Sequence, residues 1–297
     1  MSESSPGGGR PAPGVRVTAG FRAALRYHAL SVVPLARDEA CLYRKEYAER
    51  WRETLAASGA AAHALDAAVA AATDALARDP GRLRHQVDVL VCPGERPGDG
   101  PVGALERLLD PSYREAWDAA ADATQQCRLA FASLLAGRAP LLAPVRLAGI
   151  ELLDLHLCPA LSGAGRAARA GRTYAVALPL PADDAERAEA FVQLVHECCH
   201  PIADGAVAPD AGVAHDTARG SPGHRVHVLR EDAALAVGYR WLAAFPRLRD
   251  EYLRWAGRYR DPAGLEARLA GALDLPAPLR PAVIERGDAC ASAVPQP

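Results

Sequence analysis

One segment, residues 182–204, constrains the fold of this chain more than any other, because it predicts a helix with a marked start and a marked face. Asp183 and Glu186 form a capping box, in which the aspartate accepts a hydrogen bond from an unpaired backbone N–H and the glutamate reaches back. Apolar side chains recur at helical spacing on one face, namely Phe191, Leu194, Val195 and Cys198. We expect that face to be buried, with the histidines of the segment beside it.

Three residues of this helix, His196, Glu197 and His200, form the pattern HExxH. Residues four apart on an α-helix lie one turn apart on the same face, so both imidazoles can bind one metal ion. Glu197 lies beside them, where a carboxylate can serve as general base toward a water molecule whose pKa zinc lowers. We therefore predict a zinc site and disfavour an accidental pair of surface histidines.

Zinc hydrolases usually have a third protein ligand and leave the fourth position open. The extended metzincin motif would require glycine at position 203 and histidine at 206, and both positions are alanine, so that group is excluded. Glu231, in the segment LREDAALAV, follows His200 by thirty-one residues and falls on a second predicted helix. It is the preferred third ligand.

The motif and its downstream glutamate resemble the gluzincins, the thermolysin and aminopeptidase group of zinc peptidases. The matching residues are His196, Glu197, His200, Glu231 and Ala234, and Asp204 matches an acidic residue that follows the second histidine in the thermolysin motif. The resemblance covers about residues 150–245. It implies a sheet whose edge strand lines the cleft, an active-site helix, and a glutamate helix packed against it.

Two features depart from that pattern. Pro201 has no N–H to donate to the carbonyl of Glu197, so we expect the helix to kink or loosen just after His200. Cys198 is predicted to pack in the core. Cys199 is excluded as a ligand, because neighbouring helix positions do not converge on one ion.

Several other residues are candidates for roles in this site. Asp232 is the alternative to Glu231 as third ligand. His227, one turn before Glu231, could bind the metal or orient a ligand. Tyr239 and His215 are catalytic candidates that could donate a hydrogen bond to the oxyanion of a tetrahedral intermediate.

The whole chain predicts an α+β fold, mostly helical, with a small antiparallel sheet beside the HExxH helix. Residues 1–15, rich in Gly, Pro and Ser, are predicted to be a disordered tail. Residues 16–143 are predicted to be a helical region, and residues 144–297 the zinc catalytic region, sharing one core with the preceding helices.

Short apolar runs predict the strands of that sheet. Residues 145–157 and 172–180 are expected to form an antiparallel pair joined by a Gly-containing linker, and residues 85–94 a further short strand. Two helices are expected over 102–109 and 112–137, and a further helix is expected to begin near Ser221 and Pro222.

Composition limits the partners of the chain. Its 34 basic and 36 acidic residues give a net charge of -2, which argues against binding to nucleic acid or to an anionic membrane surface. We find no secretion signal and no apolar run of the roughly eighteen residues that a membrane span needs, and we expect a soluble cytoplasmic protein. The seven cysteines form no CxxC pair and are expected to be reduced.

These observations predict a zinc-dependent hydrolase that cleaves a peptide or other amide bond in a peptide or small-molecule substrate. Two alternatives remain open at this point. The chain could be a non-catalytic metal-binding or regulatory module on a peptidase-like fold. It could also be a non-hydrolytic iron or manganese enzyme, because two histidines and one carboxylate also suit redox metals.

Overall fold

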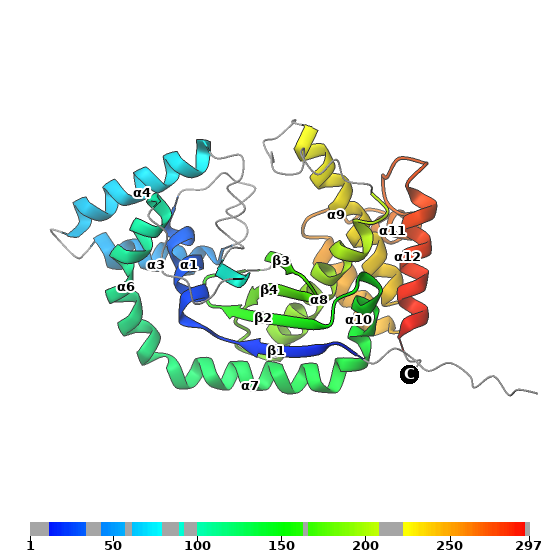
Figure 1. Ribbon diagram of the computed structural model, residues 1–297, viewed down its shortest axis with the longest axis horizontal. Helices are drawn as coiled ribbons and strands as arrows, with labels where there is room; N and C mark the ends of the chain where they lie inside the picture. The colour runs from blue at the N-terminus through cyan, green and yellow to red at the C-terminus, as the bar shows by residue number, and fades with distance from the viewer. Residues whose placement is uncertain are drawn as a thin grey trace, which may run out of the picture.

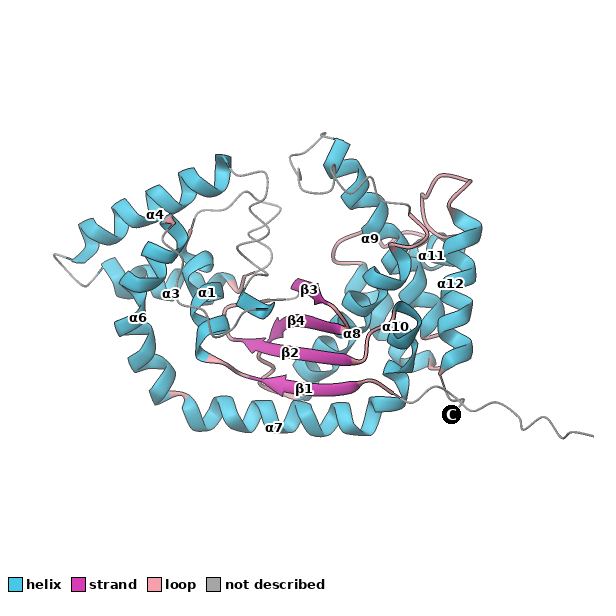
Figure 2. Ribbon diagram, in the orientation of Figure 1, coloured by secondary structure: helices cyan, strands magenta, loops and turns pink. Residues whose placement is uncertain are grey.

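A four-stranded sheet lies at the centre of the chain, and helices surround it (Figures 1 and 2). The computed structural model describes residues 12–33, 43–56, 61–78, 89–91, 100–162, 166–207 and 222–294. Most of these residues are helical. The predicted fold class, a mostly helical α+β protein with a small sheet, is confirmed.

The sheet has the strand order β1-β2-β4-β3 and is mixed. Its strands are β1 (Gly14–Thr18), β2 (Leu152–Cys158), β3 (Arg166–Ala170) and β4 (Thr173–Pro179). Strand β2 pairs in parallel with both β1 and β4, and β3 pairs antiparallel with β4. The prediction that the two apolar strands are antiparallel to each other is therefore wrong.

The reason is an additional strand in the segment predicted to be a linker. β3 has the sequence RAARA, which contains no β-branched or aromatic residue to mark it as a strand. It forms a tight hairpin with β4 across Gly171, which has a φ of 60°. The hairpin reverses the chain once more, so β4 runs in the same direction as β2.

The two faces of the sheet belong to two different hydrophobic cores, because successive strand residues point to opposite sides. Leu155 and Val176 lie in one core, which contains residues of the C-terminal helices. Cys158 and Ala177 lie in the other, which contains residues of the N-terminal helices. The sheet therefore contacts both halves of the chain.

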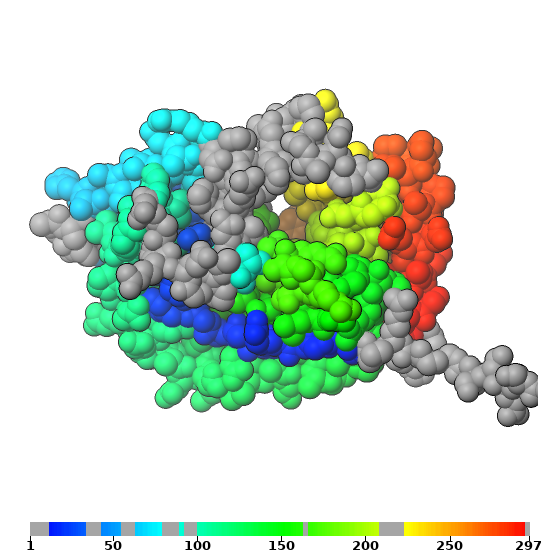
Figure 3. Space-filling view, viewed as in Figure 1, coloured from blue at the N-terminus to red at the C-terminus, as the bar shows by residue number. Residues whose placement is uncertain are grey.

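The helices pack at both ends and behind the sheet (Figure 1). They are α1 (Phe21–Val32), α3 (Lys45–Ala56), α4 (Ala61–Arg78), α6 (Pro101–Ala119), α7 (Ala121–Arg138), the 3-10 helix η1 (Ala139–Ala148), α8 (Asp184–Ala203), α9 (Pro222–Trp241), α10 (Pro246–Ala256), α11 (Leu265–Ala270) and α12 (Arg280–Ala293). In the space-filling view, β1 forms a blue band across the face below the green atoms of the other strands (Figure 3).

Several predicted boundaries differ from the structure. Helix α6 continues through Pro111, where the sequence predicts a break between two helices, and ends at Ala119. The predicted strand at 85–94 is wrong for residues 89–91, which are helical; its other residues lie outside the described ranges. Residues 145–148, predicted to begin a strand, belong to η1. The disordered tail predicted over residues 1–15 is too long at its C-terminal end, because β1 begins at Gly14.

Among the described residues, the helical stretch Ala121–Ala148 is long and apolar enough to cross a membrane by length and composition alone. Such a stretch is weak evidence for a membrane span, because core helices of soluble proteins pass the same test. Here Phe131, Leu135 and Leu142 of this stretch are buried in the core that contains α8.

A buried histidine lies in the N-terminal core. The ring of His28 stacks on Tyr113, with centroids 4.3 Å apart, and its Nδ1 lies 3.1 Å from the hydroxyl of Tyr47. The His28 Nε2 atom has no hydrogen-bond partner among the described residues. Burial lowers the pKa of His28 to about 3, so the imidazole is neutral in the folded chain.

We expect acid to destabilise the wild-type chain more than a His28→Asn variant. Below pH 6.5 the unfolded chain binds a proton at His28 that the folded chain does not bind until about pH 3, so the free energy of unfolding falls as pH falls. Between pH 7 and 4.5 this group accounts for a loss of roughly 2–3 kcal/mol. Chemical denaturation of both proteins at both pH values measures the difference, and an identical pH dependence would contradict the prediction.

Candidate metal centre

Helix α8 carries both histidines, and its start is built as the sequence predicts. Asp183 Oδ1 accepts a 2.8 Å hydrogen bond from the N–H of Glu186, and Glu186 Oε2 accepts one of 2.8 Å from the N–H of Ala182. Glu186 also pairs with Arg44 at 3.0 Å, which ties the start of α8 to the N-terminal half. The predicted apolar face is buried in the core, and consists of Phe191, Leu194, Val195 and Cys198.

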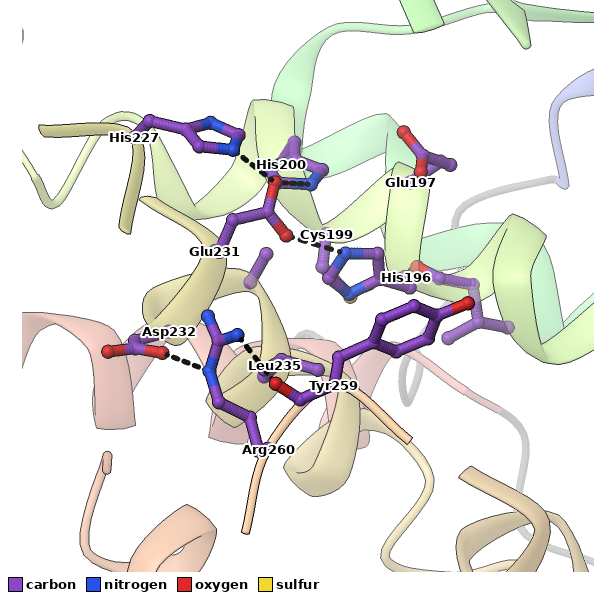
Figure 4. A network of polar contacts seen from close by, with 12 residues as sticks. His196, Glu197, Cys199, His200, His227, Glu231, Asp232, Leu235, Tyr259 and Arg260 are labelled. Atoms are coloured by element: carbon purple, nitrogen blue, oxygen red, sulfur yellow. Dashed lines mark hydrogen bonds and ion pairs between the residues drawn. The ribbon is translucent and has the colours of Figure 1, made fainter. Parts of the chain in front are cut away.

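Helix α9 packs against α8 and places Glu231 opposite the two histidines (Figure 4). Glu231 Oε2 lies 3.2 Å from His196 Nε2, and Oε1 lies 3.5 Å from His200 Nε2. His227, one turn earlier on α9, has its Nε2 3.8 Å from the same Oε1. The carboxylate of Glu231 therefore faces three imidazoles from two helices.

These separations are those expected for donor atoms around one metal ion. With zinc–nitrogen and zinc–oxygen distances of about 2.0–2.2 Å and tetrahedral angles, neighbouring donors lie about 3.3–3.5 Å apart. Glu231 comes close to this separation from each histidine through a different oxygen, with Oε2 3.2 Å from His196 and Oε1 3.5 Å from His200. Ligand atoms of His196, Glu197 and His200 also lie within 4.8 Å of one another. Two imidazoles and a carboxylate are a donor set that suits zinc, and the residues present therefore fit such an ion.

The two glutamates of the site have different electrostatic environments. Burial opposes ionisation of Glu231, but the imidazoles of His200 and His196 outweigh it and hold the pKa of Glu231 well below its usual range. For Glu197 burial dominates and raises the pKa, although His200 partly offsets the rise. Glu231 is thus the anionic ligand candidate, and Glu197 the more basic carboxylate.

Pro201 lies inside α8, and the helix is not broken there. The helix continues for two residues beyond Pro201 and ends at Ala203. The carbonyl of Glu197, which loses its helical partner to the proline, instead accepts a 3.0 Å hydrogen bond from the hydroxyl of Tyr174 on β4. A side chain of the sheet thus replaces the missing backbone donor beside the general-base candidate.

Three neighbours of the site are engaged elsewhere. Asp232, the alternative third ligand, accepts a 3.0 Å hydrogen bond from Arg260 and points away from the histidines (Figure 4). The thiol of Cys199 donates to the carbonyl of Val195 at 3.1 Å, and burial raises its pKa well above the usual range. Asp204 pairs with Arg230 of α9 at 3.4 Å. Between Glu231 and Asp232, only Glu231 faces the histidines.

Of the two residues predicted to stabilise an oxyanion, the structure describes Tyr239 and does not place it beside the histidines. Tyr239 lies on α9, but its hydroxyl donates a 2.9 Å hydrogen bond to Glu266 of α11. Eight residues along a helix correspond to about 12 Å, so Tyr239 lies well beyond Glu231. In the described structure its hydroxyl is directed to α11 and not to the histidines. His215 lies outside the described residues.

Comparisons of this chain with protein-family models, with curated proteins and with solved structures find no match. The case for a metal centre therefore rests on the geometry of the chain's own residues. Two surface hollows, of about 220 and 250 Å³, lie along the N-terminal half of α8, and neither is lined by the histidines or by Glu231. The metal candidates lie further along the helix, toward its C-terminal end.

Sequence reasoning missed the tyrosines that support the site. Tyr174 precedes Glu197 by 23 residues, and Tyr252 follows His196 by 56. Pro201 is the sequence feature that could have indicated Tyr174, because a proline inside a helix leaves a backbone carbonyl that requires another donor. We find no such signal for Tyr252.

Glu231→Gln is expected to weaken zinc binding far more than Asp232→Asn. Glutamine keeps the size of the side chain but loses the charge of the donor that faces both histidines. The zinc affinity of Glu231→Gln should fall by more than roughly 100-fold, which is the upper range of the effect of changing a residue that only supports a ligand. Asp232→Asn should change the zinc affinity less than about threefold. Competition with a chromophoric chelator measures both, and equal effects of the two variants would exclude Glu231 as the third ligand.

Tyr174→Phe is expected to destabilise the chain by about 1–3 kcal/mol, because it leaves the buried carbonyl of Glu197 without a donor. The cost should be smaller in a Pro201→Ala background, where the new backbone N–H can bond to the same carbonyl. Denaturation of the wild type, both single variants and the double variant gives the coupling energy. Simple additivity of the two changes would show that tyrosine and proline are independent.

Proposed function

We propose that this chain is a zinc-dependent hydrolase that cleaves a peptide or other amide bond, with zinc held by His196, His200 and Glu231. One observation carries the proposal, namely the Glu231 carboxylate lying 3.2 and 3.5 Å from the two Nε2 atoms of α8. Both its oxygens face imidazole nitrogens, and the neighbouring histidines favour its ionised form. The carboxylate of Glu231 and the imidazole nitrogens of His196 and His200 therefore lie close enough together to bind one ion.

The chemistry divides between the ion and the protein. When bound, zinc supplies a Lewis acid that polarises the scissile carbonyl and lowers the pKa of water. Glu197 takes a proton from the attacking water and transfers it to the leaving amine. Burial supports this role, because it makes the carboxylate more basic than one in water.

The exposure of the side chains indicates where substrate reaches the site. The His196 side chain is 5% exposed, whereas those of His200 and Glu231 are 19% and 28% exposed. His227 is 45% exposed. Substrate therefore approaches from the side of His200 and His227, and His196 forms the closed back of the site.

The test combines metal analysis with the Glu197→Gln variant. Protein purified without added metal is expected to contain zinc at about one ion per chain. Glu197→Gln should retain that zinc and lose roughly 10²–10⁴-fold in hydrolysis of a peptide and acyl-amide library. Glu189→Gln, on the same helix but paired with Arg258, is the matched control and should remain active.

Each contrary outcome has a definite meaning. A Glu197→Gln variant with full activity and a full complement of zinc removes the general-base role. Iron or manganese in place of zinc supports a non-hydrolytic enzyme on the same donor set. A zinc-loaded chain that is inert on the whole library supports a metal-binding module without catalysis.

A further inference from the structure

The closed back of the site is formed by helix α10. Tyr252 places its hydroxyl 3.4 Å from His196 Nδ1, on the side of the imidazole opposite the nitrogen that faces Glu231. The ring of Trp255 packs on the same imidazole, with centroids 4.8 Å apart. His196, Tyr252 and Trp255 are all buried. The imidazole is therefore confined by two aromatic side chains of one helix.

The Tyr252 hydroxyl is also close to two backbone carbonyls, which gives its proton an acceptor other than His196. It lies 3.3 Å from the carbonyl of Leu235 and 3.5 Å from that of Ala234, both on α9. Carbonyls only accept hydrogen bonds, so the hydroxyl can donate its single proton to one of them and keep a lone pair for His196. When Nε2 of a neutral His196 binds an ion, the ring proton lies on Nδ1, where the hydroxyl oxygen can accept it.

The proton on Nδ1 determines whether Nε2 can bind an ion. A neutral imidazole with its proton on Nδ1 has a lone pair on Nε2. That lone pair faces Glu231 Oε2 at 3.2 Å, and an ionised carboxylate is also only an acceptor. In this tautomer both groups are acceptors, and a metal ion held between them satisfies the pair; without an ion, the other tautomer satisfies the same contact by donating from Nε2–H to the carboxylate.

Gly238 makes room for the tyrosine. A Cβ atom at this position would come within 2.5 Å of Tyr252 Cζ, and closer still to its hydroxyl oxygen. Gly238 lies inside α9, where glycine costs about 1 kcal/mol relative to alanine. The close approach of Tyr252 accounts for a glycine at this position.

We propose that Tyr252 is a positioning residue of the metal centre: its hydroxyl, seated against Gly238, holds His196 as the Nδ1–H tautomer with Nε2 directed at the ion shared with His200 and Glu231. This inference rests on the zinc site of the proposed function. It does not depend on which bond, if any, is hydrolysed.

The main test is Tyr252→Phe, which keeps the ring and removes only the hydroxyl. We expect its zinc affinity, measured by chelator competition, to fall about 10–100-fold, as for other residues that orient metal-bound histidines. Tyr239→Phe removes a hydroxyl from the neighbouring helix α9, where it bonds only to Glu266 in the described contacts, and should change the affinity less than about twofold. Thermal unfolding of both variants shows whether they remain folded.

A spectroscopic readout separates positioning from general loosening. In the zinc-loaded wild type, ¹⁵N–¹H spectra should show a proton on His196 Nδ1 that is protected from exchange with solvent. Tyr252→Phe should lose that protection, whereas Tyr239→Phe should keep it. Gly238→Ala should displace the hydroxyl without removing it, and should lower the zinc affinity in the same direction as Tyr252→Phe.

The outcomes distinguish this inference from the proposed function. A folded Tyr252→Phe with wild-type zinc affinity and a protected Nδ1 proton overturns the positioning role, even if Glu197→Gln abolishes hydrolysis. A large loss of zinc affinity in a chain that hydrolyses nothing supports the positioning role and contradicts only the hydrolase. A proton found on Nε2 in the zinc-loaded chain overturns the inference directly.

Discussion

The packing of α9 against α8 is the interaction on which the site depends. Neither helix holds a complete donor set, because α8 provides two imidazoles and α9 provides the carboxylate that faces them. The Arg230–Asp204 pair joins the same two helices beyond the site. Since protein interiors are closely packed, a small shift of one helix would change both nitrogen–oxygen separations together. The geometry of the donors is thus a property of the helix interface.

Contacts from outside the helix pair hold two residues of the candidate site, Glu197 and His196. The sheet reaches the general-base candidate through Tyr174, which bonds to the backbone of Glu197. Helix α10 reaches His196 through Tyr252 and Trp255. Such contacts restrict a side chain that a helix alone leaves free to rotate, which is how outer residues tune metal sites. The mixed sheet and helix α10 therefore contact the candidate site without contributing a ligand to it.

Local spacing is enough to predict helix α8 and its candidate ligands, and not enough to predict what lies beside them. His196, Glu197 and His200 are fixed by the helical repeat, and the capping box of Asp183 marks where that helix starts. Strand β3 escapes prediction because RAARA has no strand-forming residue, and its pairing with β4 is decided by tertiary contacts. Tyr239 shows a related limit of local spacing: a residue on the same helix as Glu231 can still lie two turns farther along it.

The parallel pairing of β1 with β2 has a consequence for how the chain folds. It joins Gly14 to Leu152 across most of the N-terminal half, whereas β3 and β4 meet through a tight hairpin. Closing a long loop costs more entropy than closing a short one, so contacts near in sequence form more readily. We therefore expect the hairpin and α8 to assemble early, and β1 to join the sheet edge late. The first strand of the chain is then the last part of the sheet to be completed.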